Sequence, residues 1–347
     1  MKQLFIERPG NRQPLVLGSQ LGRGGEANVY AVADQPALAA KLWLEPDQVQ
    51  RAKLLAMLRT VPQDPAGSGS HISLAWPQGT VVDAGGQVMG FVMPRLATGS
   101  YRALHQIYHP GSRRTAAPGL GWHWLLRVAR NLSATLASLH AAGYVVGDLN
   151  ESNVLVSDRA LVTLIDLDSI QVRDGATVWR CPVGKLEYTA PELLGRSFRE
   201  VDRRPGHDVF SLAVLSFQLL MEGSHPFSGV WQGDTEPPGL EDNIRARRSP
   251  WFGSRQLSVP PAAPPARVLG PRLRRLFSRS LLAPAFARPS ARDWQRELDR
   301  FEQSLKTCRV NPLHAYSANL PTCPWCERRL KLGIDPFPAP AGLQSGK

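Results

Sequence analysis

The segment that most constrains the fold is HDVFSLAVLSFQLLMEG, at residues 207–223. As a helix it is apolar on nearly every side, which is typical of a helix buried inside a protein. Its apolar run is too short and too polar to cross a bilayer. The chain has 347 residues, enough for one large or two modest domains with a buried core. We therefore expect a globular protein with this helix in its interior.

The rest of the chain divides into a strand-rich first third and a helix-rich remainder. Residues 14–43 show the pattern strand, glycine turn, strand, turn, strand, and residues 79–94 predict a hairpin that turns at Gly85-Gly86. A helix is predicted over about 47–60. Residues 122–143 carry apolar residues at helical spacing and end at a glycine. This order predicts an α+β protein with two lobes.

Charge and cysteine usage indicate partners and location. The net charge is +12, but the arginines are scattered, which favours a basic surface over a nucleic-acid-binding stripe. The opening MKQLFIERPGNRQ lacks the apolar core of a signal peptide, so we expect a cytoplasmic protein that does not bind membranes. Three of the four cysteines fall within residues 308–326, and in a cytosolic chain such clustering favours a metal site over disulfides.

Oxygen-bearing side chains gather around two neighbouring strand-like segments. GDLNESNVLV, at residues 147–156, is followed by LVTLIDLDSI, at 161–170. Two such strands joined by a tight turn would bring Asp148, Asn153 and Asp166 into one small volume. Carboxylate and amide oxygens of this kind suit Mg²⁺. An Asp slightly apart from the metal could accept a hydroxyl proton.

Two features near the N-terminus indicate a site for an anion. LGRGGEANVY, at residues 21–30, is a glycine turn between strands, and it is either a flexible turn or a loop whose N–H groups approach phosphates. Lys41 stands alone in the apolar strand LAAKLW. Because a buried lysine without a partner is costly, Lys41 indicates a phosphate or a carboxylate nearby.

A series of motifs now gives a resemblance to a known family. In order, the chain carries Gly22-x-Gly24, Lys41 in LAAK, GDLNESN, DLD, YTAPE, HDVFSLAVL and ARPSA. Over roughly residues 15–305 these resemble the motifs of eukaryotic-like (Hanks-type) serine/threonine protein kinases. The resemblance implies a bilobal α+β fold. Its parts would be an N-lobe at residues 1–96 with an antiparallel sheet and one helix, a mostly helical C-lobe at 97–305, and a zinc-binding tail at 306–347.

The resemblance also implies the roles of individual residues. Asp148 would orient and deprotonate the substrate hydroxyl, while Asn153 and Asp166 would hold Mg²⁺ on ATP. Lys41 would bind the α- and β-phosphates. Asp208 would anchor the catalytic loop, and Arg288 would pair with Glu192. The residues that would contact the nucleotide are Gly22, Gly24, Gly25, Val29, Ala39, Lys41, Met93 as gatekeeper, Pro94, Leu96 and Leu155.

Several positions depart from the family pattern. Val146-Gly147 replaces the His-Arg that usually precedes the catalytic Asp, so we predict activity that does not depend on an activation-loop phosphate. Asp168 replaces the glycine of the metal-binding triplet. Alternation along a strand would place Asp166 and Asp168 on the same side, and only register with the family selects Asp166 as the metal ligand.

The expected helix at 47–60 lacks a glutamate to pair with Lys41, and Ala52 or a neighbour stands in its place. Glu26 and Glu45 are alternative partners, or the pair is absent, which would indicate an impaired kinase.

The catalytic loop has a further exchange. Asn150 stands where the family has a lysine, and Lys185 stands where it has a threonine before the A-P-E element. Because those positions face each other in the family, our hypothesis is that Lys185 supplies the missing cation beside the γ-phosphate. The alternative is an exposed loop lysine.

A closer resemblance lies among bacterial proteins. CPVGKLEYTAPE, GFVMP and CRVNPLHAYSANLPTCPWC together resemble the kinase of a tellurite-resistance-linked triad, which pairs it with a PPM-type phosphatase and a von Willebrand A protein. The predicted function is ATP- and Mg²⁺-dependent phosphorylation of Ser or Thr on a protein partner. One alternative is a nucleotide-binding pseudokinase that scaffolds those partners. Another is a small-molecule phosphotransferase, against which the A-P-E element and the late Arg argue.

The C-terminal tail carries a possible zinc site. Cys308, His314, Cys323 and Cys326 follow the spacing C-x₅-H-x₈-C-x₂-C. Four such ligands fit tetrahedral Zn²⁺ and leave none for water, so we expect a closed structural site. The alternative is a metal-free Cys308 with a redox C-x-x-C. Cys181 is expected to be a partly buried thiol.

Overall fold

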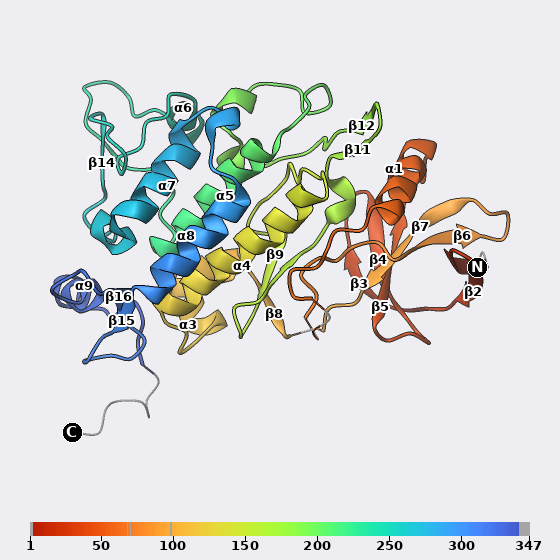
Figure 1. Ribbon diagram of the computed structural model, residues 1–347, viewed down its shortest axis with the longest axis horizontal. Coiled ribbons are helices and arrows are strands. Elements are labelled where there is room, and N and C mark those ends of the chain that lie inside the picture. The colour runs from red at the N-terminus through yellow and green to blue at the C-terminus, as the bar shows by residue number, and fades with distance from the viewer. Residues whose placement is uncertain (1–2, 68, 70, 98, 340–347) are drawn as a thin grey trace.

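The structure is a computed structural model that describes residues 3–67, 69, 71–97 and 99–339. It has two lobes (Figure 1), one built mainly from strands near the N-terminus and one built mainly from helices. The predicted α+β architecture is therefore confirmed. The last residues of the predicted tail, 340–347, lie outside the described residues.

The N-lobe is a seven-stranded antiparallel sheet in the order β2-β1-β6-β7-β5-β4-β3. The predicted hairpin at 79–94 and the strands at 14–43 are present. The sequence pattern missed β1, which lies between β2 and β6, and did not separate β2 from β3. The bounds are β1 Leu4–Arg8, β2 Asn11–Leu15, β3 Leu17–Arg23, β4 Ala27–Val32, β5 Leu38–Trp43, β6 Gly79–Asp83 and β7 Val88–Pro94.

Helix α1 (Gln48–Arg59) covers one face of this sheet. The side chain of Asp47 caps it by accepting from the N–H of Gln50 at 2.6 Å. Buried Leu54 of the helix packs with Trp43 and Phe91 of the sheet. Since side chains alternate along a strand, Lys41 of β5 points to the same face as Trp43. The sheet thus aims Lys41 toward the side where α1 lies.

A close approach between strands fixes the position of Lys41. β5 lies between β4 and β7 and pairs Lys41 with Val29 and Phe91. A Cβ on Gly90 of β7 would stand 2.0 Å from the carbonyl oxygen of Lys41. Only a glycine therefore fits at that point, and it lets the two strands pair closely.

The C-lobe is built around α5 (Pro205–Leu220), in which every residue from His207 to Leu220 is buried. The segment that reads as apolar all round is thus the central helix of the lobe, packed against α4 and α7. The other helices are α2 His105–Tyr108, α3 Pro110–Ala116, α4 Trp122–Ala141, α6 Leu240–Arg245, α7 Gly270–Leu282 and α8 Ala291–Gln303. Short strands complete it: β8 Tyr101–Ala103, β9 Val154–Ser157, β10 Val162–Leu164, β11 Val172–Asp174, β12 Thr177–Trp179, β13 Val230–Trp231 and β14 Leu257–Ser258.

The tail forms β15 (Leu305–Thr307), β16 (Ala315–Ser317) and α9 (Pro324–Leu332) at one end of the C-lobe (Figure 1). Trp325 is fully buried, with its ring centroid 5.5 Å from that of Trp122 at the start of α4 and 5.1 Å from that of Phe337. The tail and the C-lobe therefore share one hydrophobic core.

Within the described ranges, no helix combines the length and the hydropathy that crossing a membrane requires.

Candidate active site and metal centre

The catalytic loop is held by a buried carboxylate on α5. Asp208, only 1% exposed, accepts hydrogen bonds from the backbone N–H of Val146 at 2.7 Å and of Gly147 at 2.8 Å. His140 at the end of α4 donates from Nε2 to the same carboxylate at 2.9 Å. The expected anchoring role of Asp208 is confirmed. His140 was missed, because nothing in its local sequence distinguishes it from a histidine on the helix surface.

Asp148 and Asn153 lie together at the mouth of β9. Asn153 donates from Nδ2 to the carbonyl of Asp148 at 3.0 Å, and Asn150 donates to Oδ1 of Asp148 at 2.9 Å. The N–H of Ile165 donates to the carbonyl of Asn153 at 3.1 Å, which brings the residue before Asp166 to the same place. The β9–β10 hairpin thus brings Asp148 and Asn153 together and places the backbone just before Asp166 beside them, while a shared volume for all three side chains stays a prediction.

The segment that bears Asp166 differs from the sequence prediction. β10 ends at Leu164, Asp166 has a left-handed backbone with φ 60°, and Leu167–Ser169 form a 3₁₀ turn. The prediction that Asp166 and Asp168 share one side of a strand is therefore wrong, because neither residue lies on a strand. The turn brings both carboxylates to one partner instead.

That partner is Lys41. Its Nζ lies 2.5 Å from Oδ1 of Asp166 and 2.6 Å from Oδ1 of Asp168. Burial alone would lower the pKa of Lys41, but the two carboxylates, Asp168 first, outweigh it and hold the pKa above its usual value. Lys41 therefore stays a cation that joins the N-lobe to the C-lobe.

The prediction that Glu26 or Glu45 pairs with Lys41 is wrong. Glu26 and Glu45 are exposed, and neither forms an ion pair with Lys41 among the described residues. Ala52 is also exposed. Its neighbour Lys53 is half-buried; burial lowers the pKa of Lys53 to about 8, and the charges of Cys181, Asp168 and Asp166 act against that shift. No sequence signal distinguished it from the surface lysines.

The position of Arg203 explains why a glycine, Gly147, directly precedes Asp148. Gly147 has φ +77°, and a Cβ there would stand 2.5 Å from Nη1 of Arg203 and 2.8 Å from Cβ of Cys181. Arg203 is 4% exposed, donates from Nη2 to the carbonyl of Val183 at 2.7 Å and lies 4.0 Å over the ring of Phe198. A guanidinium from another loop thus fills the space beside the catalytic loop, and it bonds directly to the segment between Asp168 and the A-P-E element, called the activation segment below.

Lys185 lies beside the catalytic loop but does not contact Asp148. Its Nζ is 2.8 Å from Oε1 of Glu151 and 2.9 Å from Oγ of Ser152. Asn150 takes the place next to Asp148. The Lys185 side chain is 41% exposed but is paired with a carboxylate of the catalytic loop, so both of its predicted roles stay open.

The expected nucleotide-contacting residues lie on adjacent strands. Gly24 closes the β3–β4 turn by donating to the carbonyl of Ala27 at 2.9 Å. Ala39 pairs with Met93 across β5 and β7. Gly25 lies in the same turn, and the other members of this set fall on β3, β4 or β7, just after β7 or on β9: Gly22, Val29, Pro94, Leu96 and Leu155. Leu155 is half-buried.

The ion pair expected in the C-lobe is present. Arg288 binds Glu192 through two parallel hydrogen bonds, Nη1 to Oε1 at 2.6 Å and Nη2 to Oε2 at 2.9 Å. The Arg288 side chain is 0% exposed, so this charge is buried and paired in the geometry that suits a guanidinium. The pair fixes the A-P-E element against the segment that follows α7.

Comparison with known proteins agrees with this geometry. The sequence profile described as protein kinase domain matches residues 91–294, which is more than half of the chain. The chain belongs to the protein kinase family. The fold of this family implies ATP and Mg²⁺, the phosphate donor and the metal for which Lys41, Asn153 and Asp166 are suited.

Relatives extend the similarity to both lobes. Protein kinase YegI of Escherichia coli (strain K12) is 36% identical over 317 residues, which are 89% of this chain and 48% of YegI. The chain thus spans about half the length of this relative. Serine/threonine-protein kinase PknL of Mycobacterium tuberculosis (strain ATCC 25618 / H37Rv) is 33% identical over 109 residues, 31% of this chain and 26% of PknL.

A solved structure shares the kinase fold. The ROP18 kinase domain in complex with AMP-PNP and sucrose superposes with a TM-score of 0.56 at 16% identity, covering 86% of this chain and 84% of that chain. At this identity the similarity concerns the fold alone.

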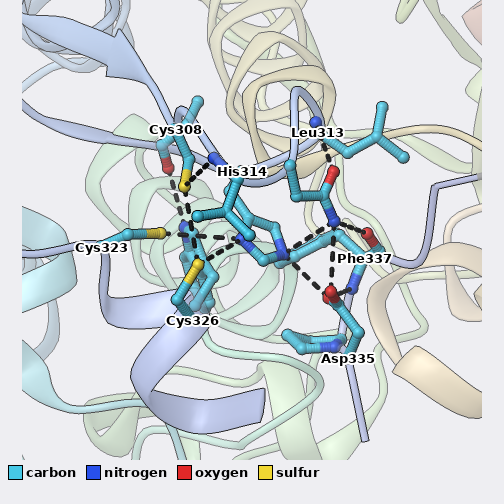
Figure 2. Close-up of polar contacts among 12 residues, drawn as sticks. Cys308, Leu313, His314, Cys323, Cys326, Asp335 and Phe337 are labelled. Carbon is cyan, nitrogen blue, oxygen red and sulfur yellow. Dashed lines mark hydrogen bonds and ion pairs between the residues drawn. The ribbon is translucent and has the colours of Figure 1, made fainter. Parts of the chain in front are cut away.

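The tail brings its four predicted ligands together (Figure 2). The ligand atoms of Cys308, His314, Cys323 and Cys326 all lie within 4.8 Å of one another. Nδ1 of His314 is 3.6 Å from the sulfurs of both Cys323 and Cys326, and Sγ of Cys308 is 3.5 Å from that of Cys326. This arrangement favours a single metal centre over an isolated Cys308 beside a redox pair.

A carboxylate that the sequence did not reveal orients the histidine. Nε2 of His314 lies 2.8 Å from Oδ1 of Asp335, and Nδ2 of Asn311 lies 3.2 Å from Oδ2 of the same carboxylate (Figure 2). Because Nε2 is taken, Nδ1 is left to face the three sulfurs. A histidine held by a carboxylate in this way is typical of metal-binding proteins.

The steric role of Gly147 can be separated from its backbone conformation. Gly147→Ala adds a contact with Arg203 to the strain of a positive φ, and we expect it to lower the free energy of unfolding by about 1–3 kcal/mol beyond the strain alone. Gly143→Ala is the matched control, since Gly143 has φ +85° and a Cβ there would meet no neighbouring group within 4 Å. Chemical denaturation of both variants measures the difference. Equal losses would contradict the proposed packing.

Proposed function

We propose that the protein is an ATP- and Mg²⁺-dependent protein kinase that transfers the γ-phosphoryl group to Ser or Thr hydroxyls of a protein partner. The observation that carries the proposal is the meeting of Lys41 with Asp166 next to the cluster of Asp148 and Asn153. The buried pair of Arg288 and Glu192 favours a protein substrate, because it holds the part of the fold that protein kinases use for peptide docking.

Each group has a defined task in this reaction. Asp148 orients the substrate hydroxyl and accepts its proton, and Asn150 and Asn153 fix its carboxylate by donating to it. Bound Mg²⁺ would neutralise charge on the nucleotide phosphates, and Asn153 and Asp166 are the residues that would hold it. Lys41 provides a positive charge for the α- and β-phosphates. Phosphoryl transfer needs little beyond such positioning and neutralisation.

A nucleotide-binding pseudokinase is the second candidate. Lys53 in place of a helix glutamate and Asn150 in place of the catalytic-loop lysine favour it. In either case we propose that the protein works in a bacterial phosphorylation system with a PPM-type phosphatase and a von Willebrand A protein. The motifs CPVGKLEYTAPE and GFVMP support this context.

Transfer of labelled phosphate from ATP separates the two candidates. Asp148→Ala should lower autophosphorylation or partner phosphorylation by about 10²–10⁴-fold, because the proton acceptor is lost. Asp234→Ala, which changes an exposed aspartate far along the chain, should keep the wild-type rate. Replacing Ser169, Thr177 and Thr189 together should leave turnover in place. A wild-type protein that binds ATP but transfers nothing would identify the pseudokinase.

We also propose that Lys185 acts as a cation beside the γ-phosphate. Its ammonium lies at the catalytic loop, where Glu151 holds it at 2.8 Å. Lys185→Met should lower kcat by about 10²-fold with little change in KM for ATP, because the charge is needed mainly in the transition state. Lys331→Met on α9 is the control and should not change kcat. An unchanged kcat in Lys185→Met would refute this role.

For the tail, we propose a structural Zn²⁺ held by Cys308, His314, Cys323 and Cys326. The donor set fits: three sulfurs and one imidazole nitrogen converge, and Asp335 supports the histidine from behind. Since Trp325 of the same module packs on Trp122, the metal would stabilise the end of the C-lobe.

Elemental analysis tests the zinc site. We expect about one zinc per chain in the wild type, and a loss of zinc together with a lower melting temperature in Cys326→Ser. Asp335→Ala should weaken zinc binding by about 10–100-fold in competition with a chelator. Cys181→Ser, whose sulfur lies outside the cluster, is the control and should keep its zinc. Zinc well below one equivalent in the wild type would rule the site out.

A further inference from the structure

The ammonium of Lys41 is shared by two carboxylates that differ in their surroundings. Its Nζ lies 2.5 Å from Asp166 and 2.6 Å from Asp168, so the distances do not distinguish them. Exposure does: the side chain of Asp166 is 47% exposed and that of Asp168 is 19% exposed. Asp166 also follows Ile165, whose N–H binds the carbonyl of Asn153. Asp166 is thus the more exposed of the two carboxylates and directly follows a residue bonded to the predicted metal ligand, whereas Asp168 is the more buried one.

Helix α1, which lies on the side of the sheet to which Lys41 points, carries a second half-buried cation, Lys53. Lys53 of α1 makes no ion pair or hydrogen bond within the described parts of the chain, and burial lowers its pKa to about 8. The carboxylates nearest to it in electrostatic effect are those of Asp168 and Asp166. The helix therefore cannot supply the negative charge that would hold Lys41 in position. Within the described residues, the negative charge comes from the turn at 167–169 and the residue before it.

We propose that Asp168 is the positioning residue for Lys41 and takes over the task of the missing helix glutamate, which leaves Asp166 free to bind the metal. The inference rests on the proposed function, since it assigns two tasks within the same phosphoryl-transfer site. With nucleotide and Mg²⁺ bound, Lys41 would contact a phosphate oxygen in place of Asp166 and would keep its contact with Asp168. The aspartate in the glycine position of the metal-binding triplet and the absence of a helix glutamate then have one explanation.

The dependence of activity on Mg²⁺ concentration separates a positioning residue from a metal ligand. We expect Asp168→Asn to lower kcat at least ten-fold while the Mg²⁺ concentration at half-maximal rate changes less than two-fold. Asp166→Asn should instead raise the required Mg²⁺ concentration at least ten-fold or abolish turnover at every concentration. Glu45→Gln, which removes an exposed carboxylate near α1, should match the wild type in both measurements.

A second test moves the carboxylate from position 168 to position 53 on the helix. Asp168→Gly restores the glycine of the family pattern and should be at least as impaired as Asp168→Asn. Adding Lys53→Glu, which puts a carboxylate on the helix, should recover at least ten-fold of that loss. The control is Asp168→Gly with Lys53→Gln, which removes the helix cation without adding a negative charge and should recover less than three-fold.

The proposal is overturned if Asp168→Asn keeps wild-type turnover, if added Mg²⁺ relieves its defect, or if Lys53→Glu recovers no more than Lys53→Gln. If the proposed kinase activity itself is absent, the experiments give a different result. If the wild type binds a fluorescent ADP analogue but transfers no phosphate, the Mg²⁺ titration of binding decides the inference in the same way. A shift of that titration in Asp166→Asn but not in Asp168→Asn supports it, and the reverse refutes it.

Discussion

The structure depends on one half-buried ammonium group at the junction of the two lobes. Lys41 stands on the N-lobe sheet, and its partners Asp166 and Asp168 stand on a turn of the C-lobe. Removing a lysine from water is costly, and pairing with carboxylates offsets the cost. The same pairing brings together the strand that carries the proposed phosphate-binding cation and the turn that carries the proposed metal ligand. The same contact thus links the two lobes and lies at the proposed site, alongside other contacts between the lobes such as the hydrogen bond of Tyr144 to the carbonyl of Thr60.

The C-lobe supplies the rigid support for this contact. α5 is buried along almost its whole length, and its carboxylate Asp208 fixes two backbone N–H groups just before Asp148. A charged group that deep in the core is stable only because all of its hydrogen bonds are made. Arg203 then fills the space that Gly147 leaves and bonds to the activation segment. The segment is thus held by a contact that needs no phosphate.

The sequence predicted the parts of the site that follow fixed motifs, and it missed those that depend on how elements pack. Asp148, Asn153 and Lys41 follow from the order of the motifs, and α5 follows from its apolar composition. Lys53 could not be predicted, because a run of mixed residues in α1 does not show which of them lies near Asp168 and Asp166. The short strand β1 was missed since charged residues flank it and its pairing partner β6 is distant in sequence. Asp335 lies 21 residues after its partner His314, with no motif to mark it.

The most direct test of this account is a crystal structure with AMP-PNP and Mn²⁺, in which anomalous scattering locates the metal. We predict Mn²⁺ between the nucleotide phosphates, Asn153 and Asp166, and Lys41 between a phosphate oxygen and Asp168. A metal bound by Asp168 instead, or a nucleotide that does not lie between the lobes, would contradict the account.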